Sequence, residues 1–223
     1  MGLIIKRFIN TPVPSNTYVV YEERAKECVV IDPGSKEGAE LIAFFEESGI
    51  MPTYILLTHE HFDHIWGCNV LAEKYDARII CSEVCSQKIA VPQNYYNKLY
   101  NNSEEFYSIP SVCTTVENIG FLLDLGWVEF RFMLTPGHSS SSICIDMGGL
   151  LFTGDTVMNG YKPLILKRHE GSKEQFKKSV SMIFEKYDAH TKIYPGHGEV
   201  FALGEARGFY EEYFRRNNLK LMS

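Results

Sequence analysis

The chain has 223 residues, of which 45% are hydrophobic and 22% charged, and its formal net charge is −6. This composition is typical of one folded globular domain and excludes a disordered or fibrous chain. No run of Lys and Arg stands out and no stretch of about 18 apolar residues occurs, so the sequence argues against nucleic-acid and membrane partners and favours a small-molecule substrate.

The cysteines do not form the framework of a disulfide-rich protein. They are Cys28, Cys68, Cys81, Cys85, Cys113 and Cys144, too few and too irregularly spaced for a chain of this length. Cys81 and Cys85 could ligate a metal as a pair, but no second pair follows, so ordinary thiols are favoured. The N-terminal segment carries no secretion signal. We therefore expect a cytoplasmic protein with free thiols.

Extended and helical patterns alternate along the first third of the chain. β-Branched and aromatic residues predict strands at residues 2–9, 16–21, 27–32, 53–58 and 77–82. The DPGS turn predicts a helix that Ser35 caps and that runs through Glu47. The last two strands flank a predicted helix over residues 65–75.

The pattern loosens over residues 83–120, which are rich in Asn and Tyr. We interpret this segment as an insertion or lid within a single domain that spans residues 1–223. Three further strands are predicted between residues 127 and 154, followed by a helix over 172–187 with Ser172 as its N-cap. A last strand near residue 193 and a helix over 203–217 complete the chain. Two groups of strands, each followed by a helix, predict an α/β protein with a two-sheet core.

A cluster of metal-type donors follows the strand at residues 53–58. In the stretch THEHFDH, His59 and His61 are two residues apart, so in extended backbone they leave the same face and could share one ion. Asp63 and His64 come next and could serve a second ion. The cluster contains no cysteine, which favours a catalytic over a structural metal site. A zincin motif is excluded because position 63 is Asp rather than His.

Three further donors follow predicted strands. His138 lies in TPGHSS, Asp155 in FTGDT and His197 in YPGHGE, and each segment pairs a buried strand with a Gly-containing loop. A fold can bring such strand ends to one rim, so we expect these residues near the THEHFDH cluster. His169 and His190 lack this context and are interpreted as solvated side chains.

THEHFDH, TPGH, GDT and PGHG, in this order, resemble the metallo-β-lactamase superfamily and in particular its glyoxalase II-like hydrolases. The resemblance runs from about Asn16 to Gly198. It implies a four-layer αβ/βα sandwich, α/β (α+β) in class, in which two facing mixed sheets are flanked by helices and the metals lie at one edge between them. It also implies two divalent metal ions, zinc first, while iron and manganese accept the same ligands.

The resemblance assigns a role to each donor. It implies that His59, His61 and His138 hold the first metal, that Asp63, His64 and His197 hold the second, and that Asp155 bridges them. Asp32, in IDPG, is similar to a family aspartate that supports the ligands by orienting an imidazole. A turn or helix cap at DPG is an equally weighted interpretation of Asp32.

Two adjacent cations can share a water molecule, lower its pKa and polarise a carbonyl, so hydrolysis of a small thioester or acyl ester is the expected reaction. Asp63 is the expected catalytic residue, because it could orient the water and accept its proton. Glyoxalase II enzymes carry glutathione-binding residues in a helical region after PGHG, whereas about 25 residues follow Gly198 here. The sequence therefore predicts an acyl substrate but does not identify glutathione, or any other thiol, as the carrier of the acyl group.

Several residues are candidates for substrate contacts. Lys167 and Arg168 could bind a substrate carboxylate, although two solvated charges explain them as well. Tyr161 is a candidate for the pocket wall. The tyrosines of the insertion, Tyr95, Tyr96, Tyr100 and Tyr107, could form a lid, but packing or homo-oligomer contacts are favoured.

Two other functions stay open. A mononuclear iron dioxygenase acting on persulfides shares much of the same motif set, and metal content and oxygen uptake would separate it from a hydrolase. A protein of another class, a metal-holding redox or binding partner, is the second alternative. A metal-type residue is present at every motif position, which argues against a protein that keeps the fold but has lost its metal site.

Overall fold

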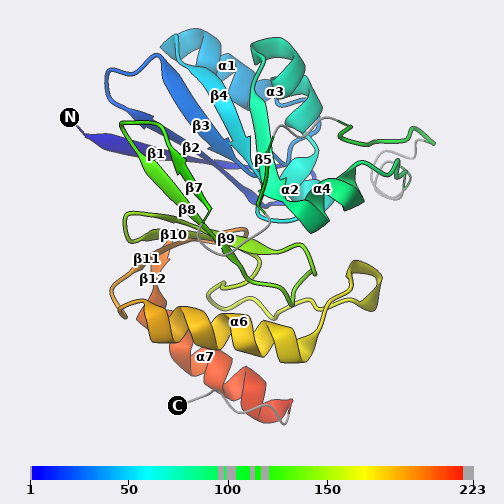
Figure 1. The fold of residues 1–223 in the computed structure, drawn as a ribbon, viewed down its shortest axis with the longest axis vertical. Helices are drawn as coiled ribbons and strands as arrows, with labels where there is room; N and C mark the ends of the chain where they lie inside the picture. Colours follow the sequence, from blue (N-terminus) through cyan, green and yellow to red (C-terminus); the bar gives the residue numbers. More distant parts are fainter. Residues whose placement is uncertain (1, 95–97, 99–103, 111–113, 117–120, 218–223) are drawn as a thin grey trace. The chain divides into compact units, whose positions relative to one another are not determined.

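The computed structural model describes residues 2–94, 98, 104–110, 114–116 and 121–217. The chain divides into two compact units, residues 1–116 and 117–223. Each unit contains one six-stranded sheet and its own helices (Figure 1).

The sheet of the first unit has the order β1-β2-β3-β4-β5-β6. Its strands are β1 (Leu3–Ile9), β2 (Asn16–Glu22), β3 (Glu27–Ile31), β4 (Met51–Leu56), β5 (Arg78–Ser82) and β6 (Thr114–Val116). β1, β2 and β3 pair antiparallel, whereas β3 to β6 pair parallel. Ile31 pairs with Leu56, so β3 and β4 end side by side. The residues that follow these two strands are thereby brought together.

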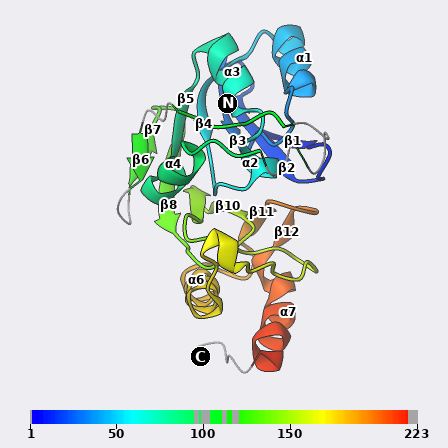
Figure 2. The same cartoon turned by 90° about the vertical axis from the view of Figure 1, so that its right-hand side faces the viewer.

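The helices of the first unit are α1 (Ala39–Ser48), α2 (Phe62–Ile65), α3 (Cys68–Tyr75) and α4 (Glu83–Ile89). α1 and α3 lie side by side along the sheet (Figures 1 and 2). Leu41 and Phe45 of α1 and Leu71 of α3 pack against buried strand residues such as Val30 and Ile55. Burial of these apolar side chains stabilises the unit.

The sheet of the second unit has the order β12-β11-β10-β9-β8-β7. Its strands are β7 (Leu122–Asp124), β8 (Glu129–Leu134), β9 (Ile143–Met147), β10 (Leu150–Gly154), β11 (Lys192–Pro195) and β12 (Phe201–Ala202). Only β10 and β11 pair parallel, with Gly154 opposite Pro195. The loops that follow β10 and β11 therefore start next to each other.

Two long helices complete the second unit. α6 (Lys173–Lys186) and α7 (Leu203–Arg216) lie side by side (Figure 2), and the short 3-10 helix η1 (Lys167–His169) precedes α6. Phe176 of α6 and Tyr210 and Phe214 of α7 are fully buried in one cluster with strand residues. The apolar face of each amphipathic helix is therefore buried in this cluster.

Most predicted elements are present. All nine predicted strands and the helices at α1, α6 and α7 are confirmed, as is Ser172, whose hydroxyl accepts a hydrogen bond from the Gln175 amide at 3.3 Å. The prediction that Ser35 caps α1 is wrong: the helix starts at Ala39 after Gly38, which adopts a left-handed conformation. The predicted helix over 65–75 is divided into α2 and α3.

The described cysteines are buried and form no disulfide, as expected for free thiols; Cys113 lies outside the described residues. Burial raises the pKa of the Cys28 and Cys68 thiols, and a hydrogen bond with Cys81 together with burial raises that of Cys85. These thiols therefore stay protonated near neutral pH. Every helix among the described residues is too short or too polar to span a bilayer.

The predicted insertion is described only in part. α4 occupies its start, and Gln93 forms an antiparallel bridge with Tyr107. The hydroxyl of Tyr107 donates to the Ile65 carbonyl at 2.9 Å, so this tyrosine packs against α2. Tyr95, Tyr96 and Tyr100 lie outside the described residues. The lid and oligomer interpretations stay predictions.

Candidate metal centre

In the first unit, Asp32 connects the ends of β3 and β4. Its Oδ1 accepts a hydrogen bond from the Thr58 amide at 2.8 Å, and its Oδ2 accepts from the Thr58 hydroxyl at 2.6 Å. His64 Nδ1 lies 2.9 Å from the same Oδ2. The carboxylate is 2% exposed, so these three contacts replace the hydration that an ionised group needs.

These contacts assign the tautomers of two histidines. The single proton of the Thr58 hydroxyl goes to Asp32, so His59 Nδ1, which lies 3.0 Å from that hydroxyl, must donate to it. His64 Nδ1 donates to the carboxylate of Asp32. Each ring therefore carries its lone pair on Nε2, the form in which imidazole binds a metal. Asp32 sets one tautomer directly and the other through Thr58.

The other donors of the THEHFDH motif lie close to these rings. The His59 ring centroid is 4.5 Å from that of His61 and 4.3 Å from that of His64. Asp63 Oδ2 lies 3.7 Å from His64 Nε2. All four side chains are buried. Asp32, His59 and His64 also offer donor atoms within 4.8 Å of one another.

A network of small polar residues fixes the backbone of this motif. Ser15 donates its hydroxyl to the carbonyl of Asp63 and accepts from Asn10 Nδ2 at 2.9 Å. Asn10 Oδ1 accepts from the amide of Ser35 at 3.1 Å. A Cβ at Gly34 would lie 1.7 Å from the Asp63 carbonyl oxygen. The DPGS turn and the metal-type motif are therefore in direct backbone contact.

In the second unit, Asp155 lies between two histidines. Its Oδ2 is 3.5 Å from His138 Nε2 and 3.5 Å from His197 Nε2. All three side chains are at most 16% exposed. One carboxylate oxygen equally distant from two imidazole nitrogens has the arrangement expected of a bridging ligand.

Glycines bring the loops of this unit close to neighbouring backbone. Gly137, with φ 143°, precedes His138, and a Cβ there would lie 2.2 Å from the backbone of Phe176 in α6. The Gly137 carbonyl accepts from the Ser172 amide at 2.9 Å. The Gly196 amide in turn donates to the Gly154 carbonyl at 2.8 Å, which ties the His197 loop to the Asp155 loop.

The loop after Asp155 is held by Tyr210, and replacing Tyr210 with Phe should lower the free energy of unfolding by about 1–2 kcal/mol. The buried hydroxyl accepts from the Met158 amide at 2.9 Å and lies 3.3 Å from the Thr156 carbonyl, and burial raises its pKa. The substitution leaves both backbone groups without this partner. Urea unfolding measures the loss, with Tyr213→Phe, which removes a half-buried hydroxyl from the same helix, as control. Equal stability of the Tyr210→Phe and wild-type proteins would contradict the expectation.

The candidate substrate contacts lie in the second unit. Tyr161 is 47% exposed, and its ring centroid is 6.2 Å from that of His197. Lys167 and Arg168 are exposed on η1, where Arg168 Nε donates to His169 Nε2 at 3.1 Å. Tyr161 is thus adjacent to a predicted ligand, and substrate binding by these three residues stays a prediction.

Each unit brings its own predicted donors together: His59, His61, Asp63 and His64 in the first, and His138, Asp155 and His197 in the second. These donors are imidazole nitrogens and carboxylate oxygens, which suit zinc, iron or manganese. The His59 and His64 rings are already in the tautomer that can bind a metal through Nε2. The sequence interpretation missed Thr58, which sets the His59 tautomer. Its place directly before His59 is the only sequence signal for that role.

Comparisons with known proteins agree with this chemistry. The family model described as the metallo-beta-lactamase superfamily matches residues 10–197. A hydroxyacylglutathione hydrolase of Enterobacter sp. (strain 638) is 32% identical over 176 residues, which are 78% of this chain and 59% of that protein. The probable polyketide biosynthesis zinc-dependent hydrolase BaeB of Bacillus velezensis is 28% identical over 204 residues, which are 91% of this chain and 79% of BaeB.

A solved structure shows the same fold. The BLEG-1 B3 metallo-beta-lactamase has a TM-score of 0.77 and 23% identity, over 92% of this chain and 97% of that one. The α/β class with two mixed, helix-flanked sheets is thereby confirmed. The chain belongs to the metallo-β-lactamase superfamily, most of whose members are metal-dependent hydrolases. It spans 59% of the length of the hydroxyacylglutathione hydrolase, and its own substrate is a separate question.

Proposed function

We propose that this protein is a dinuclear metal-dependent hydrolase of a small thioester or acyl ester. The observation that carries the proposal is the position of Asp155 Oδ2, 3.5 Å from both His138 Nε2 and His197 Nε2. A carboxylate in that position suits a pair of ions better than a single one. The names of the hydroxyacylglutathione hydrolase and of BaeB support hydrolysis, and the latter supports zinc.

The proposed ligands follow the motif order: His59, His61 and His138 for one ion, Asp63, His64 and His197 for the other, and Asp155 for both. Bound divalent ions would supply a water molecule of lowered pKa and a polarised carbonyl. Asp63 would orient that water and accept its proton as the oxygen attacks the carbonyl carbon. The C–S or C–O bond then breaks, and the proton leaves with the thiol or alcohol.

Metal content and turnover test the proposal together. Mass spectrometry of freshly purified protein should give about two zinc, iron or manganese ions per chain. Hydrolysis of S-lactoylglutathione and of a simple acetyl thioester should be lost on chelation and restored by zinc. His197→Gln should abolish turnover, whereas His190→Gln, which changes an exposed histidine outside the motifs, should not.

Two other outcomes would each replace the proposal. About one iron per chain, with oxygen uptake on a persulfide and no hydrolysis, would identify the dioxygenase alternative. Bound metal with neither activity would favour a redox or binding partner.

A further inference from the structure

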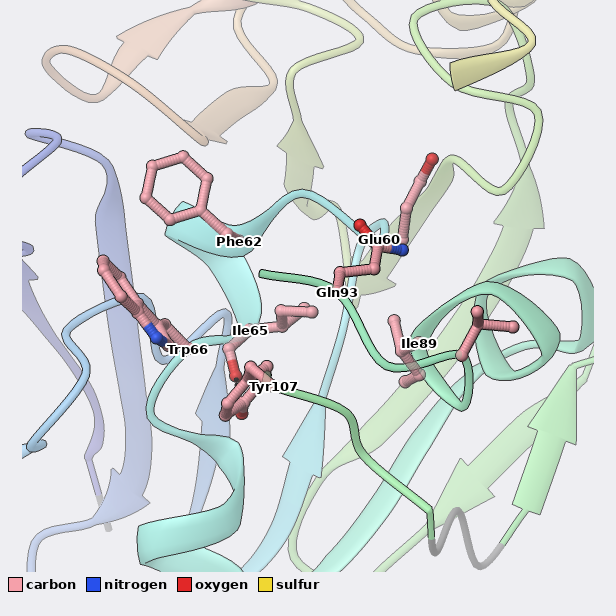
Figure 3. Close-up of a pocket in the computed structure, with 8 residues that line it drawn as sticks. Glu60, Phe62, Ile65, Trp66, Ile89, Gln93 and Tyr107 are labelled. Carbon is pink, nitrogen blue, oxygen red and sulfur yellow. Dashed lines mark hydrogen bonds between the residues drawn. The ribbon is translucent and has the colours of Figure 1, made fainter. Parts of the chain in front are cut away.

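A small apolar pocket adjoins the metal-type motif within the first unit. Its walls include Phe62, Ile65 and Trp66 from the segment of α2, together with Ile89 and Tyr107 (Figure 3). Figure 3 shows Phe62 and Trp66 on one side and Ile89 on the other, with Ile65 and Tyr107 between them. The pocket therefore lies between the motif and the segment that follows β5.

Specific contacts keep the two walls together. Tyr107 donates its hydroxyl to the Ile65 carbonyl at 2.9 Å, and the Ile109 amide donates to the Ile89 carbonyl at 2.8 Å. The rings of Phe62 and Trp66 meet edge to face at 5.2 Å. Burial raises the pKa of Tyr107, so its phenol stays neutral and adds no charge to the wall.

Glu60 connects the pocket to the predicted ligands. It lines the pocket, and one of its carboxylate oxygens lies within 4.8 Å of a ring nitrogen of His61. Lys88 pairs with Glu60 at 3.0 Å, so the charge of this buried carboxylate is balanced. A group held at the His61 ring could thus extend an arm into the apolar space.

The size and polarity of the pocket restrict its occupant. The cavity volume is about 30 Å³, more than the roughly 10–15 Å³ that one water molecule needs but too little for a long chain. Glu60 and Gln93 also line the pocket, but most of the lining side chains are apolar. A polar thiol carrier would therefore lose hydrogen bonds against most of the wall, whereas each methylene buried there is favourable. We infer that the pocket receives the short apolar acyl group of the substrate, an inference that rests on the proposed hydrolysis.

Chain-length preference tests this inference on the metal-loaded protein. With acetyl, butyryl and octanoyl thioesters of one small thiol, kcat/KM for butyryl should exceed that for acetyl about tenfold, and octanoyl should fall below butyryl. Ile89→Phe should reduce the butyryl-to-acetyl ratio to about one, and Ile89→Ala should move the optimum to a longer chain. The matched controls Val84→Phe and Val84→Ala, at an exposed position on the same helix, should keep the wild-type ratio.

A binding measurement keeps the inference testable without turnover. Trp66 and Trp127 are the two tryptophans of the chain, so Trp127→Phe makes Trp66 the sole fluorescent indole. Its emission should change saturably with butyrate and should respond less to acetate. Folded Ile89 variants with wild-type preference, or an emission that butyrate does not change, would overturn the pocket assignment. Saturable butyrate binding without hydrolysis of any thioester would refute the proposed function and leave the pocket standing.

Discussion

Replacing Asp32 with Asn is expected to weaken metal binding by about 10- to 100-fold. Asn keeps the shape of the side chain but exchanges one acceptor oxygen for a donor group. If the amide donates to His64 Nδ1, the ring proton moves to Nε2, and that nitrogen can no longer bind a metal. If the amide takes the Oδ1 position instead, it faces the backbone N–H of Thr58, which loses its acceptor, so the residue that sets the His59 tautomer is no longer held in place. Competition with a chromophoric chelator measures the affinity.

Asp76→Asn is the matched control. Asp32 and Asp76 both have left-handed backbone, with φ of 52° and 56°, and Asn tolerates that region as Asp does. Both variants lose one negative charge, but Asp76 is exposed at the C-cap of α3. Metal affinity should therefore fall only in Asp32→Asn. Wild-type affinity in that variant, or an equal loss in both, would show that the carboxylate does not support the ligands.

The strands that lead to the site could be predicted from the sequence because each is a run rich in β-branched, aromatic or other apolar residues, and most of these runs end at a Gly-containing turn. β6, β7 and β12 could not, because two or three residues are too few for any periodic pattern. Ser35 was misinterpreted for a different reason. Its hydroxyl lies 3.1 Å from Asn10 Oδ1, a partner 25 residues away, and the helix begins later, after Gly38.

The candidate donors could be named from their motifs, but the support around them could not. Asp32 meets Thr58 and His64 only because β3 and β4 are adjacent and in a particular register, across 26 and 32 residues of sequence. The contact between Ser15 and the carbonyl of Asp63 spans 48 residues. Tertiary pairing of this kind leaves no local pattern in a single sequence.

Replacing Gly34 with Ala is expected to lower the free energy of unfolding by about 3 kcal/mol or more and to weaken metal binding with it. The new Cβ would lie 1.7 Å from the Asp63 carbonyl oxygen and 2.7 Å from Asn10 Nδ2. The backbone oxygen cannot rotate away as a flexible side chain could, and Ser15 holds it through a hydrogen bond. Relief therefore requires the DPGS turn and α2, which carries Asp63 and His64, to move apart.

Gly208→Ala adds the same methyl group, but its expected effect on the free energy of unfolding has the opposite sign. Gly208 lies inside α7, and a Cβ there meets no atom within 4 Å. Alanine favours helix over glycine by about 0.5–1 kcal/mol, so this variant should be slightly more stable than the wild type. Urea unfolding and chelator competition on both variants separate a local clash from a general cost of adding a methyl group. Gly34→Ala could instead unfold at the wild-type urea concentration and keep its metal. That result would show that the close contact between the DPGS turn and the motif does not position Asp63 and His64.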